Sequence, residues 1–229
     1  SFTPLEIRSE ALNMDYFPVP WDTEIIGYPV AEISRFEVLD VENAKTQFSQ
    51  FEQWRESNNI ELCSCRIDHG SLAESFFLQE HGFRFIELNY HPEFRNLSHQ
   101  SFPDQSIEIA VADEKDQEVL ADIAANTFKH GRFHQDISLG SSIGNKRYKI
   151  WLINSFSRQS QVVYKCVLNG EIVGFFVTEY MDNKRCNWVL VGLAPGLEGQ
   201  GMGTRVWQAM MKFHQAEGCY RGNFEFKIK

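Results

Sequence analysis

The chain has 229 residues, of which 43% are hydrophobic and 23% are charged, a composition typical of soluble globular proteins with a buried core. Its formal net charge of −9 excludes the basic footprint of a nucleic-acid binder, and no apolar run reaches membrane-spanning length. The five cysteines match no zinc-binding spacing and show no pairing logic, which favours a reducing cytoplasm. We therefore expect a cytoplasmic protein without metal, nucleic-acid or membrane partners, and a homodimer stays open.

The first hundred residues predict a small α/β unit with the order β-α-β-α-β. Asp40 is expected to cap a helix, and Ser71-Leu72-Ala73-Glu74 has the spacing of a capping box that opens a second helix. The other expected elements are an extended arm over residues 1–20, strands over 21–36, 60–67 and 83–94, and a buried face of the second helix made of Leu72, Ala73, Phe76 and Phe77.

The polar, turn-rich stretch 96–105 (NLSHQSFPDQ) predicts a linker. We therefore expect two domains, over residues 1–97 and 106–229. The second should contain a strand over 107–111, a helix capped by Asp113, a long loop over 129–144, a helix with Tyr148 and Trp151, a hairpin turning at Asn169-Gly170, and a final strand, turn and helix.

The stretch 187–216 (NWVLVGLAPGLEGQGMGTRVWQAMMKFHQA) organises the second domain as strand, glycine-rich turn and helix. Such a turn gathers backbone N–H groups and the positive end of a helix dipole in one place, which suits a pyrophosphate. The spacing of Gly199, Gly201 and Gly203 matches neither the dinucleotide fingerprint nor a Walker loop. A tight turn without a ligand is the alternative interpretation.

The run Glu198-Gly199-Gln200-Gly201-Met202-Gly203 resembles the acetyl-CoA-binding motif Gln/Arg-x-x-Gly-x-Gly/Ala of the GNAT N-acetyltransferase superfamily. The element order over residues 106–218 is similar as well. The resemblance implies an α/β (α+β) fold, with a mixed central sheet flanked by helices, beside a smaller N-terminal α/β domain. It implies acetyl-CoA as donor, held by Val191, Gly192, Leu193, Glu198, Gly199, Gln200, Gly201, Met202, Gly203 and Thr204.

Two features of this motif carry specific expectations. Gly192, in the strand expected to bind the pantetheine arm, should permit close approach of the ligand. Glu198 departs from the Gln or Arg of the family, and its carboxylate should be unfavourable near a pyrophosphate unless it points to solvent.

A second resemblance is to TDP-fucosamine (TDP-4-amino-4,6-dideoxygalactose) N-acetyltransferases. It implies an acceptor related to a nucleotide-linked amino sugar, bound by Arg132, Phe133, Tyr148 and Trp151, with the Arg132 guanidinium on the diphosphate. A surface role for Arg132 and core packing for Trp151 are the alternatives. The resemblance rests on Arg132-Phe133, Arg147-Tyr148, Trp151, Asn154 and the Leu-x-x-x-Gly-Phe run from Leu78 to Phe83.

Acetyl transfer to an amine requires a neutral amine, hydrogen-bond donors for the oxyanion and a proton for the leaving thiolate. Glu179, which we place near a strand end, is the candidate general base because partial removal from water favours uptake of a proton. A solvated turn carboxylate is the alternative role of Glu179, and a chain of waters could serve as base.

In the resembling sugar transferases, a Tyr on a helix beyond the cofactor helix protonates the thiolate. The residues after Gly218 (CYRGNFEFKIK) alternate as one strand, with Tyr220 before it, so no such Tyr is assigned. We therefore expect further residues of the protein between Arg221 and Gly222 or after Lys229.

These observations predict an N-acetyltransferase that moves an acetyl group from acetyl-CoA to a small amine, the amine of a nucleotide-linked amino sugar, by direct attack in a ternary complex. One alternative is a GNAT enzyme acting on a protein N-terminus or another small amine. The other is a catalytically silent module that binds acyl-CoA.

Overall fold

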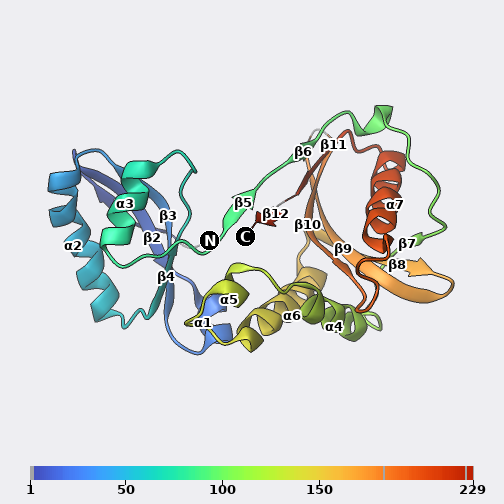
Figure 1. Ribbon diagram of the computed structural model, residues 1–229, viewed down its shortest axis with the longest axis horizontal. Coiled ribbons are helices and arrows are strands. Elements are labelled where there is room, and N and C mark those ends of the chain that lie inside the picture. The colour runs from blue at the N-terminus through green and yellow to red at the C-terminus, as the bar shows by residue number, and fades with distance from the viewer. Residues whose placement is uncertain (1–2, 183, 225, 229) are drawn as a thin grey trace. The chain divides into compact units, whose positions relative to one another are not determined.

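The computed structural model of the chain describes residues 3–182, 184–224 and 226–228 (Figure 1). They divide into two compact units, Ser1–Phe85 and Ile86–Lys229. The boundary lies before the expected domain end at residue 97. The expected linker contains a short 3-10 helix, Leu97–His99, and Leu97 is fully buried in a core of the second unit. Residues 86–97 therefore belong to the second unit, where Phe94 packs against the core that includes Leu97.

The first unit is a four-stranded sheet in the order β1-β2-β3-β4, with β1, β2 and β3 antiparallel and β4 parallel to β3. Its core is formed by apolar side chains of the sheet and of two helices, including Met14, Ile33, Phe48 and Phe77. The elements are β1 (Leu5–Arg8), β2 (Leu12–Pro18), α1 (Pro20–Ile26), β3 (Val30–Val38), α2 (Val41–Ser57), β4 (Leu62–Cys65) and α3 (Leu72–Glu80).

Three expectations for this unit were wrong. Residues 3–20, the described part of the expected arm, are not an extended arm, because β1 and β2 form a hairpin in which Leu12, Met14 and Tyr16 alternate into the core. The strand expected over 21–36 begins only at Val30, since Pro20 opens helix α1 at a position where a missing N–H costs nothing. The strand expected over 83–94 reduces to β5 (Leu88–Tyr90) and β6 (Glu93–Phe94), both in the second unit.

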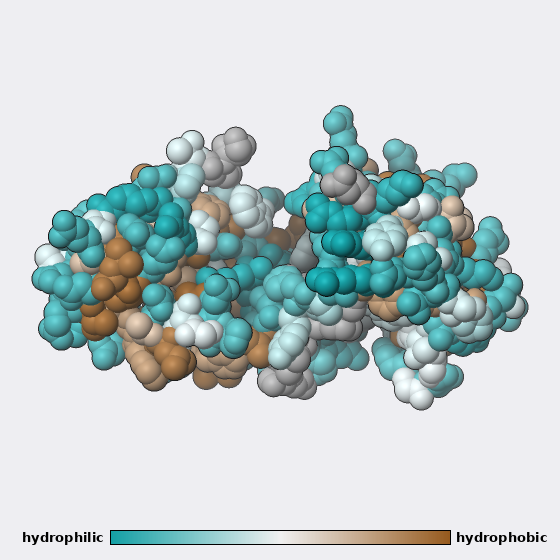
Figure 2. All heavy atoms as spheres, turned by 90° about the horizontal axis from the view of Figure 1, so that it is seen from above, coloured by the Kyte–Doolittle hydropathy of each residue, from teal (hydrophilic) through white to brown (hydrophobic). Residues whose placement is uncertain are grey.

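The two long helices of the first unit differ in how well their starts were predicted. The Asp40 cap is confirmed, since its carboxylate accepts from the N–H groups of Glu42 and Asn43. The capping box is wrong, because Glu74 instead accepts from the N–H of Val38 at 3.0 Å and Ser71 makes no capping bond. Helix α3 buries Phe77 and Leu78, whereas Leu72 and Phe76, expected inside, are 62% and 61% exposed. Hydrophobic residues are visible on the surface of this unit at the left of Figure 2.

The second unit is built on a six-stranded sheet in the order β6-β11-β10-β9-β8-β7. Neighbouring strands are antiparallel except β10 and β11, which run parallel. Besides β6, this sheet contains β7 (Glu108–Val111), β8 (Gln161–Leu168), β9 (Glu171–Met181), β10 (Arg185–Leu193) and β11 (Arg221–Phe224). A separate strand, β12 (Phe226–Ile228), pairs with β5. The expected last strand is thus split into β11, which begins earlier, and β12.

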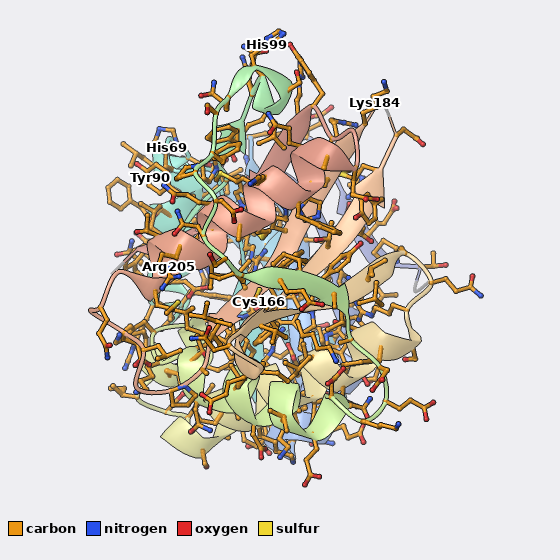
Figure 3. All side chains as sticks on the ribbon, turned by 90° about the vertical axis from the view of Figure 1, so that its right-hand side faces the viewer. His69, Tyr90, His99, Cys166, Lys184 and Arg205 are labelled. Atoms are coloured by element: carbon orange, nitrogen blue, oxygen red, sulfur yellow. The ribbon has the colours of Figure 1, made fainter. Side chains whose placement is uncertain are left out.

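Helices cover both faces of this sheet (Figure 1). Helix α7 (Met202–Ala216) lies on one face, and α4 (Gln117–Thr127) and α6 (Ser141–Ser157) pack on the other. Figure 3 looks onto α7, with Arg205 close to the N-terminal end of the helix and Lys184 at the β9–β10 turn. Successive residues of β9 alternate between these faces, so that Phe176 packs in the α7 core and Phe175 and Val177 in the α4–α6 core.

The helices and the hairpin of this unit lie close to where the sequence predicted them, with differences at two points. The hairpin turns at Asn169 and Gly170, which have φ of 54° and 85° as its turn type requires. Helix α4 begins later than expected, with Asp116 rather than Asp113 as the residue before its first turn. The expected long loop contains a short helix, α5 (Arg132–Gln135).

Candidate active site

Strand β10 loses its neighbour on one side halfway along its length. It pairs with β11 only from Arg185 to Trp188. On the other side it continues to pair with β9 as far as Leu193, with a register shift between Trp188 and Leu190 that makes Val189 a bulge. Within the described part of the chain, residues 189–193 therefore present main-chain groups on an open edge. An extended ligand with amide groups can bind such an edge as an added strand.

The glycine-rich turn follows directly from this edge. Gly196, Gly199 and Gly201 have φ of 86°, 75° and 76°, values at which a side chain would strain the backbone. Gly201 is the N-cap of α7 and no side chain caps this helix. Among the described residues, the N–H groups of the first helical turn therefore find no acceptor, and they lie at the positive end of the helix dipole. The turn is suited to bind an anion.

The Glu198 carboxylate is exposed to solvent, which is the arrangement that the sequence required for an anion to bind nearby. The carboxylate turns back onto its own turn and accepts from the N–H of Gly196 at 2.8 Å. Hydrogen bonds from its own N–H and that of Gly196, with the charge of Lys129, hold the pKa of Glu198 below its usual value. The carboxylate thus stabilises the turn, and the helix-start N–H groups stay available. Lys129, which sequence reasoning missed, adds positive potential at the turn.

Gly192 has a packing role that differs from the one expected. A Cβ at this position would lie 2.5 Å from Cε1 of Phe175 and 3.3 Å from Oγ1 of Thr127. The glycine therefore makes room for the Phe175 ring on the α4 side of the sheet. The hydroxyl of Thr127 lies 2.8 Å from the carbonyl oxygen of Leu193, which ties the end of α4 to the end of the open edge.

The residues expected to bind the acceptor do come together, around the ring of Phe133. The Arg132 guanidinium lies 4.7 Å from the centre of this ring, and the Arg147 guanidinium lies 4.4 Å from it and 5.3 Å from the ring of Trp151. We call Arg132, Phe133, Arg147 and Trp151 the arginine–aromatic cluster. Cation–π contacts hold its two guanidinium groups in fixed positions.

Tyr148 packs beneath this cluster and is no wall of an open site. It is only 3% exposed and stacks on Phe128 with ring centres 4.2 Å apart. Phe133 is also buried, at 4% exposure. Phe133 therefore packs against the arginines and Tyr148 against Trp151, and the contact with an acceptor expected of both rings stays a prediction.

Glu179 lies within β9, two residues before the strand ends at Met181, and is half-buried. The strand register places it opposite Asn187 on β10 and Gln161 on β8. Asn187 precedes the Val189 bulge by two residues, a distance of about 7 Å along a strand. Sequence reasoning found Glu179 but missed its neighbours, because only the pairing of the strands brings them together. Its role as a base stays a prediction.

The described residues can also be compared with the requirements of a metal site and of a membrane-spanning helix. No set of three or more His, Cys, Asp or Glu side chains among the described residues is grouped so that it could hold a metal ion. Likewise, none of the described helices combines the length and the apolar character needed to cross a bilayer.

Residues 139–224 match the family model described as the acetyltransferase (GNAT) family. The chain is 20% identical over 185 residues to the spore coat polysaccharide biosynthesis protein SpsD of Bacillus subtilis (strain 168). That alignment covers 79% of this chain and 62% of SpsD, so the chain spans less than two thirds of the length of this relative.

Two solved structures share the fold. A GCN5-related N-acetyltransferase from Sphaerobacter thermophilus superposes with a TM-score of 0.63 and 12% identity, over 96% of this chain and 68% of its own. A functionally unknown conserved protein from Staphylococcus epidermidis ATCC 12228 gives a TM-score of 0.61 and 12% identity, over 99% and 84%.

These findings confirm the expected fold class. The family match covers most of the β8–β11 sheet, the open edge of β10, the glycine turn and helix α7, which are the parts that form the candidate site. The second unit of the chain therefore has the GNAT fold, and residues 139–224 within it resemble the GNAT acetyltransferase family.

Proposed function

We propose that the protein is an N-acetyltransferase that moves the acetyl group of acetyl-CoA to the amine of a small acceptor, by direct attack in a ternary complex. The observation that carries this proposal is the continuity of the open β10 edge with the uncapped start of α7. Coenzyme A is a diphosphate joined to an extended arm with two amides. The open edge can bind the extended arm as an added strand, and the start of α7, which follows it, can bind the diphosphate.

Acetyl-CoA supplies the activated acetyl group, and the chain supplies binding and orientation. The first-turn N–H groups of α7 and the charge of Lys129 would hold the diphosphate. The main chain of residues 189–193 would bind the arm. A bulge leaves one residue outside the ladder, so the main chain at Val189 is free to donate to a thioester oxygen on which negative charge develops.

For the acceptor, we propose a nucleotide-linked amino sugar. The arginine–aromatic cluster supports this choice, because two guanidinium groups fixed against rings suit a diphosphate. The relative SpsD is named for spore coat polysaccharide biosynthesis, a process that uses activated sugars. A protein N-terminus would need no diphosphate site, so the cluster favours the sugar nucleotide over that alternative.

The decisive experiment replaces the glycine that begins α7. Gly201→Val forces a β-branched side chain into a positive φ and displaces the N–H groups that face the diphosphate. We expect the dissociation constant of acetyl-CoA, measured by calorimetry, to rise at least about tenfold, or about 1.4 kcal/mol. Gly218→Val is the matched control, because Gly218 has a φ of 85° at the other end of the same helix. It should strain the fold alike and leave acetyl-CoA affinity unchanged.

If a folded Gly201→Val variant bound acetyl-CoA as the wild type does, the cofactor site would be wrong. Amine-dependent release of free CoA then separates an enzyme from a silent acyl-CoA-binding module. We expect release with TDP-linked amino sugars and none with peptides that have a free N-terminus.

A further inference from the structure

Four polar residues form a continuous row across the central sheet of the second unit. The strand register pairs Gln161 with Glu179, Glu179 with Asn187, and Asn187 with Asn223. We call these four side chains, on β8, β9, β10 and β11, the polar row. Because adjacent strands lie about 4.8 Å apart, the row extends roughly 14 Å across the sheet.

All four side chains lie on the same face of the sheet. Their sequence neighbours point to α7, since Thr178 and Trp188 hydrogen-bond to His214 of that helix. A Cβ at Gly222, the neighbour of Asn223, would strike the Trp188 ring on that same side. Successive residues of a strand point to opposite faces, so the polar row lies on the face that α4 and α6 cover in part.

The polar row holds oxygen atoms that lack partners. Oε1 of Gln161 and Oδ1 of Asn223 are buried from solvent and accept no hydrogen bond within the described part of the chain. Each such atom costs about 1–3 kcal/mol relative to a satisfied one. Glu179 and Asn187, between them, are half-buried. Glu93, the next residue in line on β6, is already engaged by Arg95 and Arg221, which leaves Glu179 as the carboxylate at the centre.

A site that combines a central carboxylate with flanking amide oxygens suits a cation that carries several hydrogen-bond donors. An alkylammonium group with hydroxyl neighbours has that character. The polar row also crosses β10 just before the pairing with β11 ends and the open edge begins. A group bound at Glu179 would therefore lie about 7 Å along the strand from the Val189 bulge, within reach of an acetyl group bound there.

We propose that the polar row is the subsite for the acceptor's amino group, an inference that rests on the proposed function. The Glu179 carboxylate binds the ammonium and takes one of its protons. The amides of Gln161 and Asn223 bind hydroxyl groups beside it, and Asn187 completes the row. The substrate class is thus an amine on a polyhydroxylated ring, not an alkylamine with an apolar body.

The chemical step balances with the groups present. The ammonium gives one proton to Glu179, and the neutral amine attacks the thioester carbonyl. A C–N bond forms, the C–S bond breaks, and the thiolate leaves with the electron pair and takes up the second proton of the amine nitrogen. The overall products are the N-acetyl amine, CoA thiol and one proton, which Glu179 returns to solvent.

The test compares two ligands that differ in one group. TDP-4-amino-4,6-dideoxygalactose carries the ammonium, and TDP-6-deoxygalactose carries a hydroxyl in its place. In calorimetry with saturating CoA, we expect the wild type to prefer the amino sugar by at least about tenfold, as expected for hydrogen bonds to charged groups. Glu179→Gln should bind both nucleotides alike, keep its acetyl-CoA affinity and lose about 100-fold in kcat.

Three variants make this result specific. Gln161→Leu and Asn223→Leu should weaken both sugar nucleotides by about threefold to tenfold, the value of one hydrogen bond. Thr178→Val is the control on the opposite face of the same strand, next to Glu179, and should leave both affinities unchanged.

Two results would overturn the proposal while the cofactor site stands. One is a wild type that binds acetyl-CoA but shows no preference for the amino sugar or binds neither nucleotide. The other is a Glu179→Gln variant that keeps the preference. Loss of acetyl-CoA binding or of CoA release in the wild type would instead contradict the proposed function itself.

Discussion

Two groups of polar side chains lie on opposite faces of the same strands, β9 and β10, and are adjacent in sequence. On the α7 face, Thr178 and Trp188 meet His214. On the other face lies the polar row, with Glu179 next to Thr178 and Asn187 next to Trp188. The first group is closed and fully buried, and the second is half-buried with oxygens that lack partners.

The closed group shows what a structural polar network looks like in this fold. His214 is fully buried, with Nε2 3.0 Å from the Thr178 hydroxyl and Nδ1 3.0 Å from the carbonyl oxygen of Met210. The Trp188 N–H lies 3.3 Å from Nδ1. Every member lies within hydrogen-bond distance of another polar atom, as is usual for buried polar groups. The neutral Nδ1 makes one of its two contacts at a time, donating to Met210 or accepting from Trp188. The contrast teaches that buried polarity alone does not indicate a site, and that the polar row differs from the closed group in having oxygens without partners among the described residues.

The largest expected effect is a loss of stability in acid that comes from the closed group. Burial lowers the pKa of His214 to about 4, from 6.5 in a model peptide. Between those values the unfolded chain binds a proton that the folded chain does not, so stability is complete above pH 6.5 and falls as pH drops toward 4. Between pH 7 and pH 5 the free energy of unfolding should fall by about 2 kcal/mol through this residue.

Urea unfolding at the two pH values measures this loss, and His214→Gln provides the comparison because glutamine does not titrate. The wild type should lose about 2 kcal/mol more than the variant over this interval. Equal losses in both proteins would show that the imidazole is not held neutral by the fold.

The next effect separates the two faces by one residue. Thr178→Val removes the hydroxyl that meets Nε2 of His214 and leaves a buried imidazole nitrogen without its partner. We expect the free energy of unfolding to fall by about 1–3 kcal/mol. Acetyl transfer at saturating substrates should be unchanged, because Thr178 points away from the open edge and the polar row. A loss of kcat without a loss of stability would contradict the division between the faces.

The smallest stability effect is expected in the polar row. Gln161→Leu removes an amide whose oxygen has no partner among the described residues, so the free energy of unfolding should stay within about 1 kcal/mol of the wild type or rise. The KM for the acceptor should rise in the same variant, and the KM for acetyl-CoA should not. If Gln161→Leu destabilised the protein as much as Thr178→Val, the polar row would be structural.

The sequence by itself determined the features that depend on neighbours along the chain. The glycine turn and the Asn169-Gly170 hairpin were predicted correctly, because positive φ angles are local demands. Helical spacing predicted α7 as well, although the helix begins at Met202, inside the expected turn. The Asp40 cap, also a local feature, was confirmed. The fold class followed from the resemblance of the motif at Gly201 and Gly203 and of the element order to the GNAT superfamily.

Only the tertiary structure decided where distant segments meet. Glu74 bonds to Val38 of the neighbouring strand and not to its own helix start. Leu97 joins the core of the second unit and not a linker. The open edge exists because β11 stops pairing at Trp188, and the polar row exists because four strands align in one register. Pattern and propensity describe a strand's own faces, whereas pairing depends on which strands fold beside it. Gln161, Glu179, Asn187 and Asn223 therefore come to lie in one row only in the folded sheet.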